Sequence, residues 1–550
     1  MSFSARCVPV ILIFTVTVWA QSPAKQTVKT PRGSVSGKVM IKDKPAPGVW
    51  VSLHQSDLSN PFSSFLKAVT DQEGVYRITN VPAGSYEVSP SAPAFVLADF
   101  NPSARGKSVV VSEDENVDGI NFSLIRGGVI TGKVIDADGR PAIQQQVHIF
   151  RLEDMERQGP QRSVFSFANA MTDDRGIYRM YGVRAGRYKV ATGRGDDAFI
   201  GRSSTFRTTY QQVFHPDVTD PARATIIEVS EGSEAANVDI KLGAAMQTFN
   251  VSGRVVNSEN NQPLPNIRFG LQRIAGQRIE FVNSLVVSNE QGEFVIEGLT
   301  AGKYAVYLFP LPNSELRAEN FTFDVLDQDV SGLSIKLSKG ATLSGVIVLE
   351  NEDQTAWKKV AEMQVHAFVM PPGGGSMGFN QSGSASIAPD GSFRLAGLPA
   401  GTANMQIGPA NGPSINRGII ITRIERDGVM MPRGVEVKEG EQITGLRVMV
   451  SYGNGTIRGV VKIENGTLPP GAQIFVRLTK PGESFSGLRP PQVDERGHFM
   501  MEGVPPGDYE LNVQVFGTPS RPKATSRVTV QDGIVTDVTV TLDLTPTPKP

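Results

Sequence analysis

Short segments in which apolar and polar residues alternate recur along the whole chain. In one of them Val49, Val51 and Leu53 alternate with Trp50 and Ser52. Comparable alternation returns at residues 147–149, 267–271, 365–367 and 474–478. A period of two places one face of a strand in a core and the other in water, as in an antiparallel sheet. Since no long amphipathic helix is predicted anywhere, the pattern indicates an all-β chain.

A spaced motif returns five times at roughly domain-length intervals. Each copy has a glycine, an aromatic residue two positions later, Val or Leu after seven positions and a second glycine after ten. The copies begin at Gly74, Gly176, Gly292, Gly391 and Gly497, and four of them add a tyrosine two residues after the closing glycine: Tyr86, Tyr188, Tyr304 and Tyr509. A period of this kind predicts a string of one type of domain.

An Asp or Asn stands three residues before the first glycine in four copies, as Asp71, Asp173, Asn289 and Asp494. Such a side chain can bind the backbone of a hairpin turn while the glycine adopts a positive φ. A calcium site needs about six to eight oxygen ligands, so one acidic residue per turn favours turn chemistry. The tyrosines are expected to pack beneath the turn that closes the motif.

The repeats set the predicted domain limits. These are residues 31–125, 126–242, 243–338, 339–451 and 452–544, followed by a disordered, Pro-rich tail at 545–550. The fourth repeat has a degenerate motif, because Ala403 replaces the tyrosine and Ala388 the turn Asp. Linkers are nearly absent, and neighbouring domains are therefore expected to touch.

Residues 1–20 have the three parts of a cleaved secretory signal peptide: the positive Arg6, an apolar run, and a small-residue cleavage site before Gln21. The protein is therefore predicted to be exported to the periplasm, cell surface or medium. No later stretch is apolar and long enough to span a membrane. The single cysteine, Cys7, lies inside the signal, which predicts a mature chain without disulfides or Cys-ligated metal.

The charge balance narrows the range of partners. Lys and Arg number 54 against 55 Asp and Glu, so no basic field for nucleic acid exists. None of the five histidines begins a zinc-hydrolase pattern, and we predict no metal and no cofactor. Ser376 sits in a Gly-x-Ser-x-Gly match but lacks the flanking strand and helix of a nucleophile elbow, while Arg194-Gly195-Asp196 is a short adhesion-type match in a loop.

The recurring strand-Gly, Asp-x-x-Gly-x-Tyr and Val-Pro-Ala-Gly-x-Tyr segments resemble the carboxypeptidase regulatory-like domain family. The resemblance covers residues 33–544 and is most specific in the first, second and fifth repeats. It implies a tandem array of about five transthyretin-like Greek-key β-sandwich domains after a cleaved signal peptide. It also implies an accessory, non-catalytic module, for which carbohydrate binding or surface interaction is the expected role.

Two tryptophans remain after the signal, Trp50 and Trp357. Sugar rings stack on exposed aromatic faces, which makes both candidate glycan-binding residues; the alternative is burial between abutting domains. Trp50 is expected to face outward and Trp357 to lie in a loop. The sequence thus predicts a non-enzymatic exported binding protein for a glycan, or alternatively a structural or adhesive scaffold that presents its loops to a cell-envelope protein.

Overall fold

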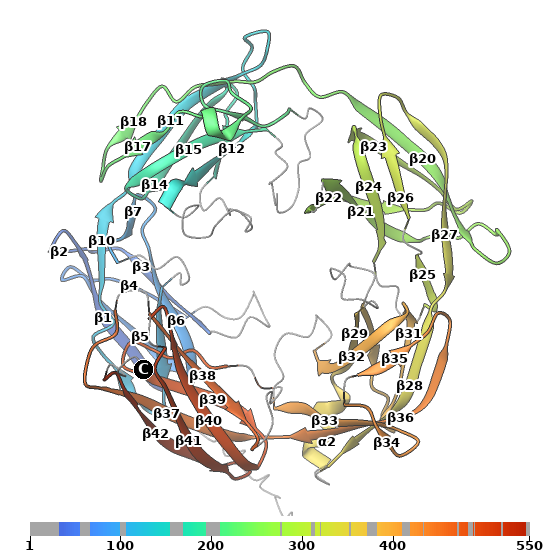
Figure 1. Ribbon diagram of the computed structural model, residues 1–550. Helices are drawn as coiled ribbons and strands as arrows, with labels where there is room; N and C mark the ends of the chain where they lie inside the picture. The colour runs from blue at the N-terminus through green and yellow to red at the C-terminus, as the bar shows by residue number, and fades with distance from the viewer. Residues whose placement is uncertain are drawn as a thin grey trace, which may run out of the picture.

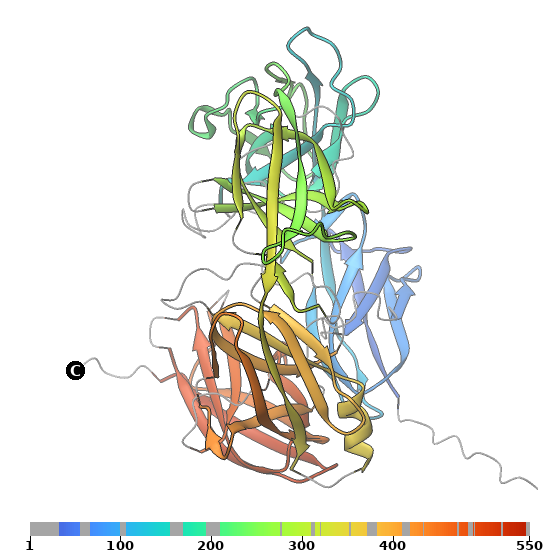
Figure 2. The same ribbon diagram turned by 90° about the vertical axis from the view of Figure 1, so that its right-hand side faces the viewer.

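The computed structural model describes residues 32–55, 66–99, 106–153, 169–193, 210–275, 278–309, 314–318, 321–350, 354–370, 382–409, 418–432, 434–469, 472–481, 488, 490–518 and 521–545. It confirms an all-β chain built of tandem β-sandwiches. The predicted signal peptide, the Ser376 motif and the Arg194-Gly195-Asp196 match lie outside the described residues. Figure 1 shows the sandwiches following one another around a ring, with the last (red) beside the first (blue). Figure 2 shows that the ring is not flat.

Each repeat consists of two sheets. In the first repeat, one sheet holds β1 (Gly33–Ile41), β2 (Lys44–Pro45), β5 (Val75–Val81), β7 (Phe95–Leu97), β9 (Asn116–Val117) and β10 (Phe122–Arg126). The other has the order β4 (Leu66–Val69), β3 (Trp50–Gln55), β6 (Gly84–Ser91) and β8 (Lys107–Val111). Strand β8 is therefore an edge strand.

The second and third repeats follow the same plan. The second has β11 (Gly128–Ile135), β14 (Ile177–Val183), β18 (Glu234–Ala235) and β19 (Ile240–Lys241) facing β12 (Gln146–Arg151), β13 (Asn169–Met171), β15 (Gly186–Thr192), β16 (Val213–Phe214) and β17 (Ile227–Val229), with a 3-10 turn η1 (Pro221–Arg223). The third has β20 (Thr248–Asn257), β23 (Glu293–Thr300), β25 (Leu316–Ala318) and β27 (Val330–Lys339) facing β21 (Arg268–Ala275), β22 (Arg278–Val287), β24 (Gly302–Leu308) and β26 (Thr322–Val325).

The fourth repeat is a two-sheet sandwich despite its degenerate motif. Its strands are β28 (Ala341–Leu349), β31 (Ser392–Leu398), β33 (Ile419–Arg426), β34 (Val429–Met430) and β36 (Gln442–Tyr452) in one sheet, and β29 (Gln364–Met370), β30 (Ser382–Ser386), β32 (Gly401–Gly408) and β35 (Val435–Val437) in the other, with helix α2 (Gln354–Ala361) between β28 and β29. The fifth has β37 (Gly455–Glu464), β39 (His498–Val504) and β42 (Val535–Asp543) facing β38 (Gln473–Thr479), β40 (Gly507–Phe516) and β41 (Lys523–Val530).

One cross-strand pair explains why the motif recurs. The aromatic residue of each copy lies opposite a glycine of the opening strand: Gly37 and Tyr76, Gly132 and Tyr178, Gly253 and Phe294, Gly345 and Phe393, Gly459 and Phe499. In the second repeat, a Cβ on Gly132 would stand 2.1 Å from the carbonyl oxygen of Val238. The Tyr178 hydroxyl donates to that same oxygen at 2.6 Å. The glycine thus permits a close backbone approach, and the aromatic ring covers the surface that it leaves open.

The predicted turn chemistry is confirmed. Asp173 Oδ1 accepts the N–H groups of Arg175 (3.0 Å) and Ile177 (2.8 Å), while Gly176 has φ of 75°. Asp71, Asn289 and Asp494 accept the equivalent pairs of N–H groups. The four tyrosines are buried and donate to the carbonyl oxygen four residues earlier. Each sandwich has its own main apolar core, and the second repeat has a further small cluster of Ala191, Phe214 and Ala224.

Candidate interaction surfaces

Trp50 lies on the outer face of β3 and is 49% exposed, as expected from its alternation. Its cross-strand neighbour Val69 is 44% exposed, and Lys67 Nζ lies 4.6 Å from the centre of the indole ring. Such a cation–π contact stabilises an exposed ring by about 0.5–1 kcal/mol. Trp50 therefore offers a partly open aromatic face that already has a cation against it.

Trp357, expected in a loop, lies on helix α2 instead. The segment contains good helix formers, and Ala356 and Val360 are buried on one side of this short helix. The indole Nε1 donates to the carbonyl oxygen of Pro389 at 3.3 Å, and the ring packs against the fourth core. The two tryptophans lie in different repeats, so they do not form one site.

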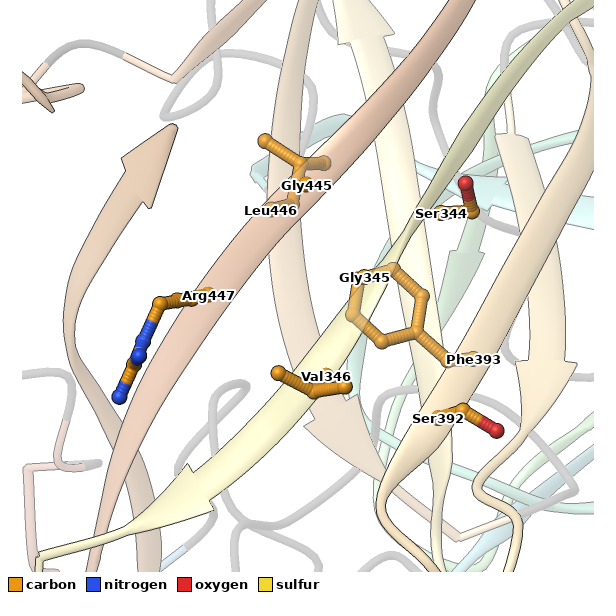
Figure 3. A pocket seen from close by; sticks show the side chains of 8 residues that line it. All are labelled: Ser344, Gly345, Val346, Ser392, Phe393, Gly445, Leu446 and Arg447. Carbon is orange, nitrogen blue, oxygen red and sulfur yellow. The ribbon is translucent and has the colours of Figure 1, made fainter. Parts of the chain in front are cut away.

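A shallow hollow of about 510 Å³ lies over the sheet β31–β28–β36 of the fourth repeat. Figure 3 shows its lining, which consists of Ser344, Gly345, Val346, Ser392, Phe393, Gly445, Leu446 and Arg447. Arg447 supplies the only charge, and its guanidinium points away from the Phe393 ring (Figure 3). The hollow surrounds the Gly345–Phe393 pair and lacks a base, an acid or a nucleophile beyond two serine hydroxyls.

Within the described residues, no group of three or more His, Cys, Asp or Glu side chains is placed to share a metal ion. No helix among them has the length and apolar character needed to cross a bilayer.

Three pairs of neighbouring repeats meet at a further glycine, which stands directly before the Val or Leu of the motif. A Cβ on Gly182 would stand 2.5 Å from the carbonyl oxygen of Pro93 in the first repeat. Gly397 faces the carbonyl oxygen of Leu316 in the same way, and Gly503 lies against Gly418. A Cβ on Gly298 would meet nothing within 4 Å, so the second and third repeats lack this type of contact.

The first and last repeats, far apart in the sequence, are joined by a contact that we call the clasp. Its members are Lys107, Ser108, Val110 and Glu115 of the first repeat and Gln492, Asp494, Glu495 and Arg496 of the fifth. The clasp binds the edge strand β8 to the fifth repeat, whose strands lie beside those of the first repeat in Figure 1. The unpaired N–H and C=O groups of an edge strand are available to a partner.

Asp494 and Arg496 bind that edge as a two-pronged fork. Asp494 Oδ2 accepts the Val110 N–H at 3.2 Å, and Arg496 Nη2 donates to the Val110 carbonyl oxygen at 2.6 Å. The prongs also bind each other, because Arg496 Nη2 lies 2.8 Å from Asp494 Oδ2. Arg496 Nη1 reaches Glu115 Oε1 at 3.0 Å. The side-chain pair therefore satisfies both outward backbone groups of one residue, as a neighbouring strand would.

Arg496 and Glu115 form a partly buried ion pair between the fifth and first repeats, with side chains 31% and 25% exposed. The Asp494 side chain is 1% exposed, and that of Arg496 is 31% exposed. Burial alone would raise the pKa of Glu115, but hydrogen bonds from the Ser112 N–H and from Arg496 hold that pKa below its ordinary value. Burial likewise opposes the charge of Arg496, and Asp494 and Glu115 outweigh it and raise the pKa of the guanidinium. Both groups are charged at neutral pH.

Val110 makes the clasp specific to the first repeat. Its side chain points away from the first core, yet it is only 2% exposed because the fifth repeat covers it. The residues at the same register position in the next three repeats are acidic: Glu228, Asp324 and Glu436. A carboxylate at this position would lie close to the carboxylate of Asp494, and two neighbouring like charges repel each other. The fork therefore fits β8 and not the equivalent strands of the second, third and fourth repeats.

The clasp was not foreseen from the sequence. The motif predicts the turn contacts of Asp494 Oδ1, but it does not reveal that Oδ2 accepts the N–H of Val110. Two signals were present: Arg496 follows Asp494 by two residues, and Val109, Val110 and Val111 form an apolar run where alternation requires a polar residue. An apolar residue on the outer face of a strand indicates a covered surface.

Comparison with known families gives one match. The family of the BOS complex subunit NOMO1-like, second beta sandwich domain, matches residues 33–118, which correspond to the first repeat. No curated protein matches the chain. The carboxypeptidase regulatory-like assignment is not among these matches and stays a prediction.

Solved structures with a likeness to this chain have low identity. A streptococcal ancillary pilin is 12% identical with a TM-score of 0.25, and covers 56% of this chain and 99% of its own. The minor pilin GBS52 of Streptococcus agalactiae is 14% identical with a TM-score of 0.22, covering 38% and 96%. The Bacillus anthracis TIE protein is 14% identical with a TM-score of 0.17, covering 78% and 76%. These scores carry no argument about function. The family match and the described sheets agree on one statement, that the chain is a multi-domain β-sandwich protein.

Proposed function

We propose that the chain is a non-catalytic scaffold of the cell envelope that holds its repeats in a closed ring and presents their outer surfaces and loops to a protein partner. The clasp carries this proposal. Domains joined by short linkers can fold without any contact between the first and the last of them. The clasp joins these two repeats and therefore restricts how all the repeats are placed relative to one another. Fixed surfaces and loops are suited to recognition. The signal-like N-terminus supports export.

The motif supports assigning the repeats to the carboxypeptidase regulatory-like kind, with limits near 31–125, 126–242, 243–338, 339–451 and 452–544. Five main cores, one in each repeat, support this division. The clasp holds backbone and ion-pair contacts, and the residues that line the hollow of the fourth repeat include no acid–base pair. Both observations agree with an accessory role.

A cysteine pair tests the closed ring. Ser108 Oγ lies 3.3 Å from Gln492 Oε1, which places the two side chains in contact across the clasp. In a chain carrying Cys7→Ser, the variant Ser108→Cys/Gln492→Cys is expected to form an intramolecular disulfide on mild oxidation. X-ray scattering of the oxidised and reduced forms should give the same radius of gyration, because the ring is already closed.

The matched control places the second cysteine at Val287, the position in the third repeat that corresponds to Gln492 and is 46% exposed. Ser108→Cys/Val287→Cys should remain a free dithiol within one chain. If both pairs form equally fast, or if oxidation of the first pair shrinks the particle, the chain is open in solution and the scaffold proposal fails.

A second candidate function, carbohydrate binding, is favoured by the half-exposed indole of Trp50. Lys67 already lies against the ring, so a sugar must use the opposite face or displace the ammonium group. If this candidate holds, a polysaccharide from a broad panel will bind the chain, and Trp50→Ala will weaken that binding at least about tenfold, which is roughly 1.4 kcal/mol. Val69→Ala, beside the ring, should change affinity far less. If calorimetry detects no heat of binding for any polysaccharide of the panel, carbohydrate binding is excluded as the function.

A further inference from the structure

The second repeat carries a second copy of the fork. Asp173 and Arg175 stand in the same Asp-acidic-Arg-Gly turn as Asp494 and Arg496, and the other three repeats lack the arginine. Arg175 Nη2 lies 3.0 Å from Asp173 Oδ2, and Arg175 Nε lies 3.3 Å from it. The corresponding distances in the fifth repeat are 2.8 and 3.1 Å. The turn thus prearranges the same two prongs in both repeats.

The two forks differ in what covers them. In the clasp Arg496 and Asp494 are 31% and 1% exposed, whereas Arg175 and Asp173 are 72% and 38% exposed. Among the described residues, no hydrogen bond from another repeat reaches the second fork. The polar atoms that bind Val110 in one case therefore face outward in the other.

Exposed apolar side chains flank the open fork. Met171 at the end of β13 is 50% exposed, and Ile177 and Tyr181 on β14 are 36% and 60% exposed. Met171 occupies the position of Gln492, which contacts Ser108 across the clasp. A rigid polar centre with an apolar rim is the composition of a protein-binding surface.

The clasp shows what such a fork and its neighbouring acidic residue bind. The fork binds the N–H and C=O of an outward apolar residue on an edge strand, and its arginine also binds a glutamate five residues later. The acidic residue between the two prongs binds a lysine three residues before the apolar one. In the second repeat Arg175 is available for that glutamate, and the exposed Asp174 replaces Glu495, the partner of the lysine. Strand β8 has this combination in Lys107, Val110 and Glu115. The equivalent strands of the next three repeats have a carboxylate in place of Val110 and would be repelled.

We propose that the Asp173–Arg175 fork is a docking site for strand β8 of a second copy of this chain. The inference requires the contacts of the clasp but not the scaffold function. Within one chain the fifth repeat holds β8 at a high effective concentration, so the second copy competes only when the clasp opens. Exchange of one contact between and within chains is a common route to association.

A cysteine trap between two differently tagged chains tests the proposal. Both carry Cys7→Ser; one has Ser108→Cys and Arg496→Ala, which frees its β8, and the other has Met171→Cys. Mild oxidation is expected to produce a disulfide-linked heterodimer that accumulates with time, even if β8 is free only briefly. Non-reducing electrophoresis and light scattering measure it.

Two controls distinguish docking from random collision. Ile143→Cys, in the same repeat and 51% exposed, replaces Met171→Cys and should give at least tenfold slower cross-linking. Adding Arg175→Ala to the Met171→Cys chain should reduce the rate to that background, whereas Arg179→Ala, on the following strand β14, should not. No heterodimer, equal rates for Met171→Cys and Ile143→Cys, or a rate unchanged by Arg175→Ala would each overturn the proposal. The result of the intramolecular Ser108→Cys/Gln492→Cys experiment does not depend on these outcomes, so the proposed scaffold function is tested separately.

Discussion

Replacing Gly132 with alanine is expected to lower the local free energy of unfolding of the second repeat by about 3 kcal/mol, the upper part of the range for overpacking. The new Cβ would stand 2.1 Å from the Val238 carbonyl oxygen and 2.4 Å from its carbon. Those atoms cannot withdraw easily, because the Val238 N–H donates to Thr131 O at 3.1 Å and Tyr178 binds the oxygen. Hydrogen exchange of peptides from β11, followed by mass spectrometry, measures the change within one repeat.

Gly243→Ala is the matched control for this variant. Gly243 lies in the segment between the second and third repeats, and a Cβ there would meet nothing within 4 Å. Its substitution should change the free energy of unfolding by no more than about 0.5 kcal/mol. Equal effects of the two variants, or protection of β11 unchanged by Gly132→Ala, would show that the close backbone approach does not limit stability.

The interior of each repeat was predictable because local rules determine it. Alternation predicts which side chains of a strand are buried, and the turn residues predict where the chain reverses. Asp173, Gly176 and Tyr188 behave as the motif requires, since their partners lie within four residues of them. The fourth repeat keeps its turn without the Asx side chain, because Ala388 still exchanges backbone hydrogen bonds with Ser392 and Gly391.

Features that depend on distant partners were less predictable. Helix α2 is too short to produce a long amphipathic pattern, and Trp357 was therefore expected in a loop. The clasp joins residues more than 380 positions apart, and its polar atoms resemble ordinary turn chemistry in the sequence. The glycines at 182, 298, 397 and 503 share a positive φ of 67–77°, which is a local requirement. Only the three-dimensional arrangement reveals that Gly182, Gly397 and Gly503 also contact the preceding repeat.

Val110→Asp is expected to open the ring. The substitution places a carboxylate in the covered position next to Asp494, and a like-charge contact in an interface destabilises it by roughly 3 kcal/mol or more. The first repeat itself should fold normally, because Val110 points away from its core and Glu228, Asp324 and Glu436 occupy the same register in other repeats. X-ray scattering should show a larger radius of gyration and a loss of the shortest distances between first and last repeats.

Val110→Thr separates the effect of charge from that of shape. Threonine has nearly the volume of valine, carries no charge, and occupies this register in the fifth repeat as Thr529. The Val110 backbone groups remain available to Asp494 and Arg496, so the threonine variant should stay closed and scatter like the parent chain. A closed ring in the aspartate variant would mean that the fork is not what selects β8. An open ring in both variants would assign the contact to the packing of the valine methyl groups, because the fork alone would then be too weak to hold the ends together.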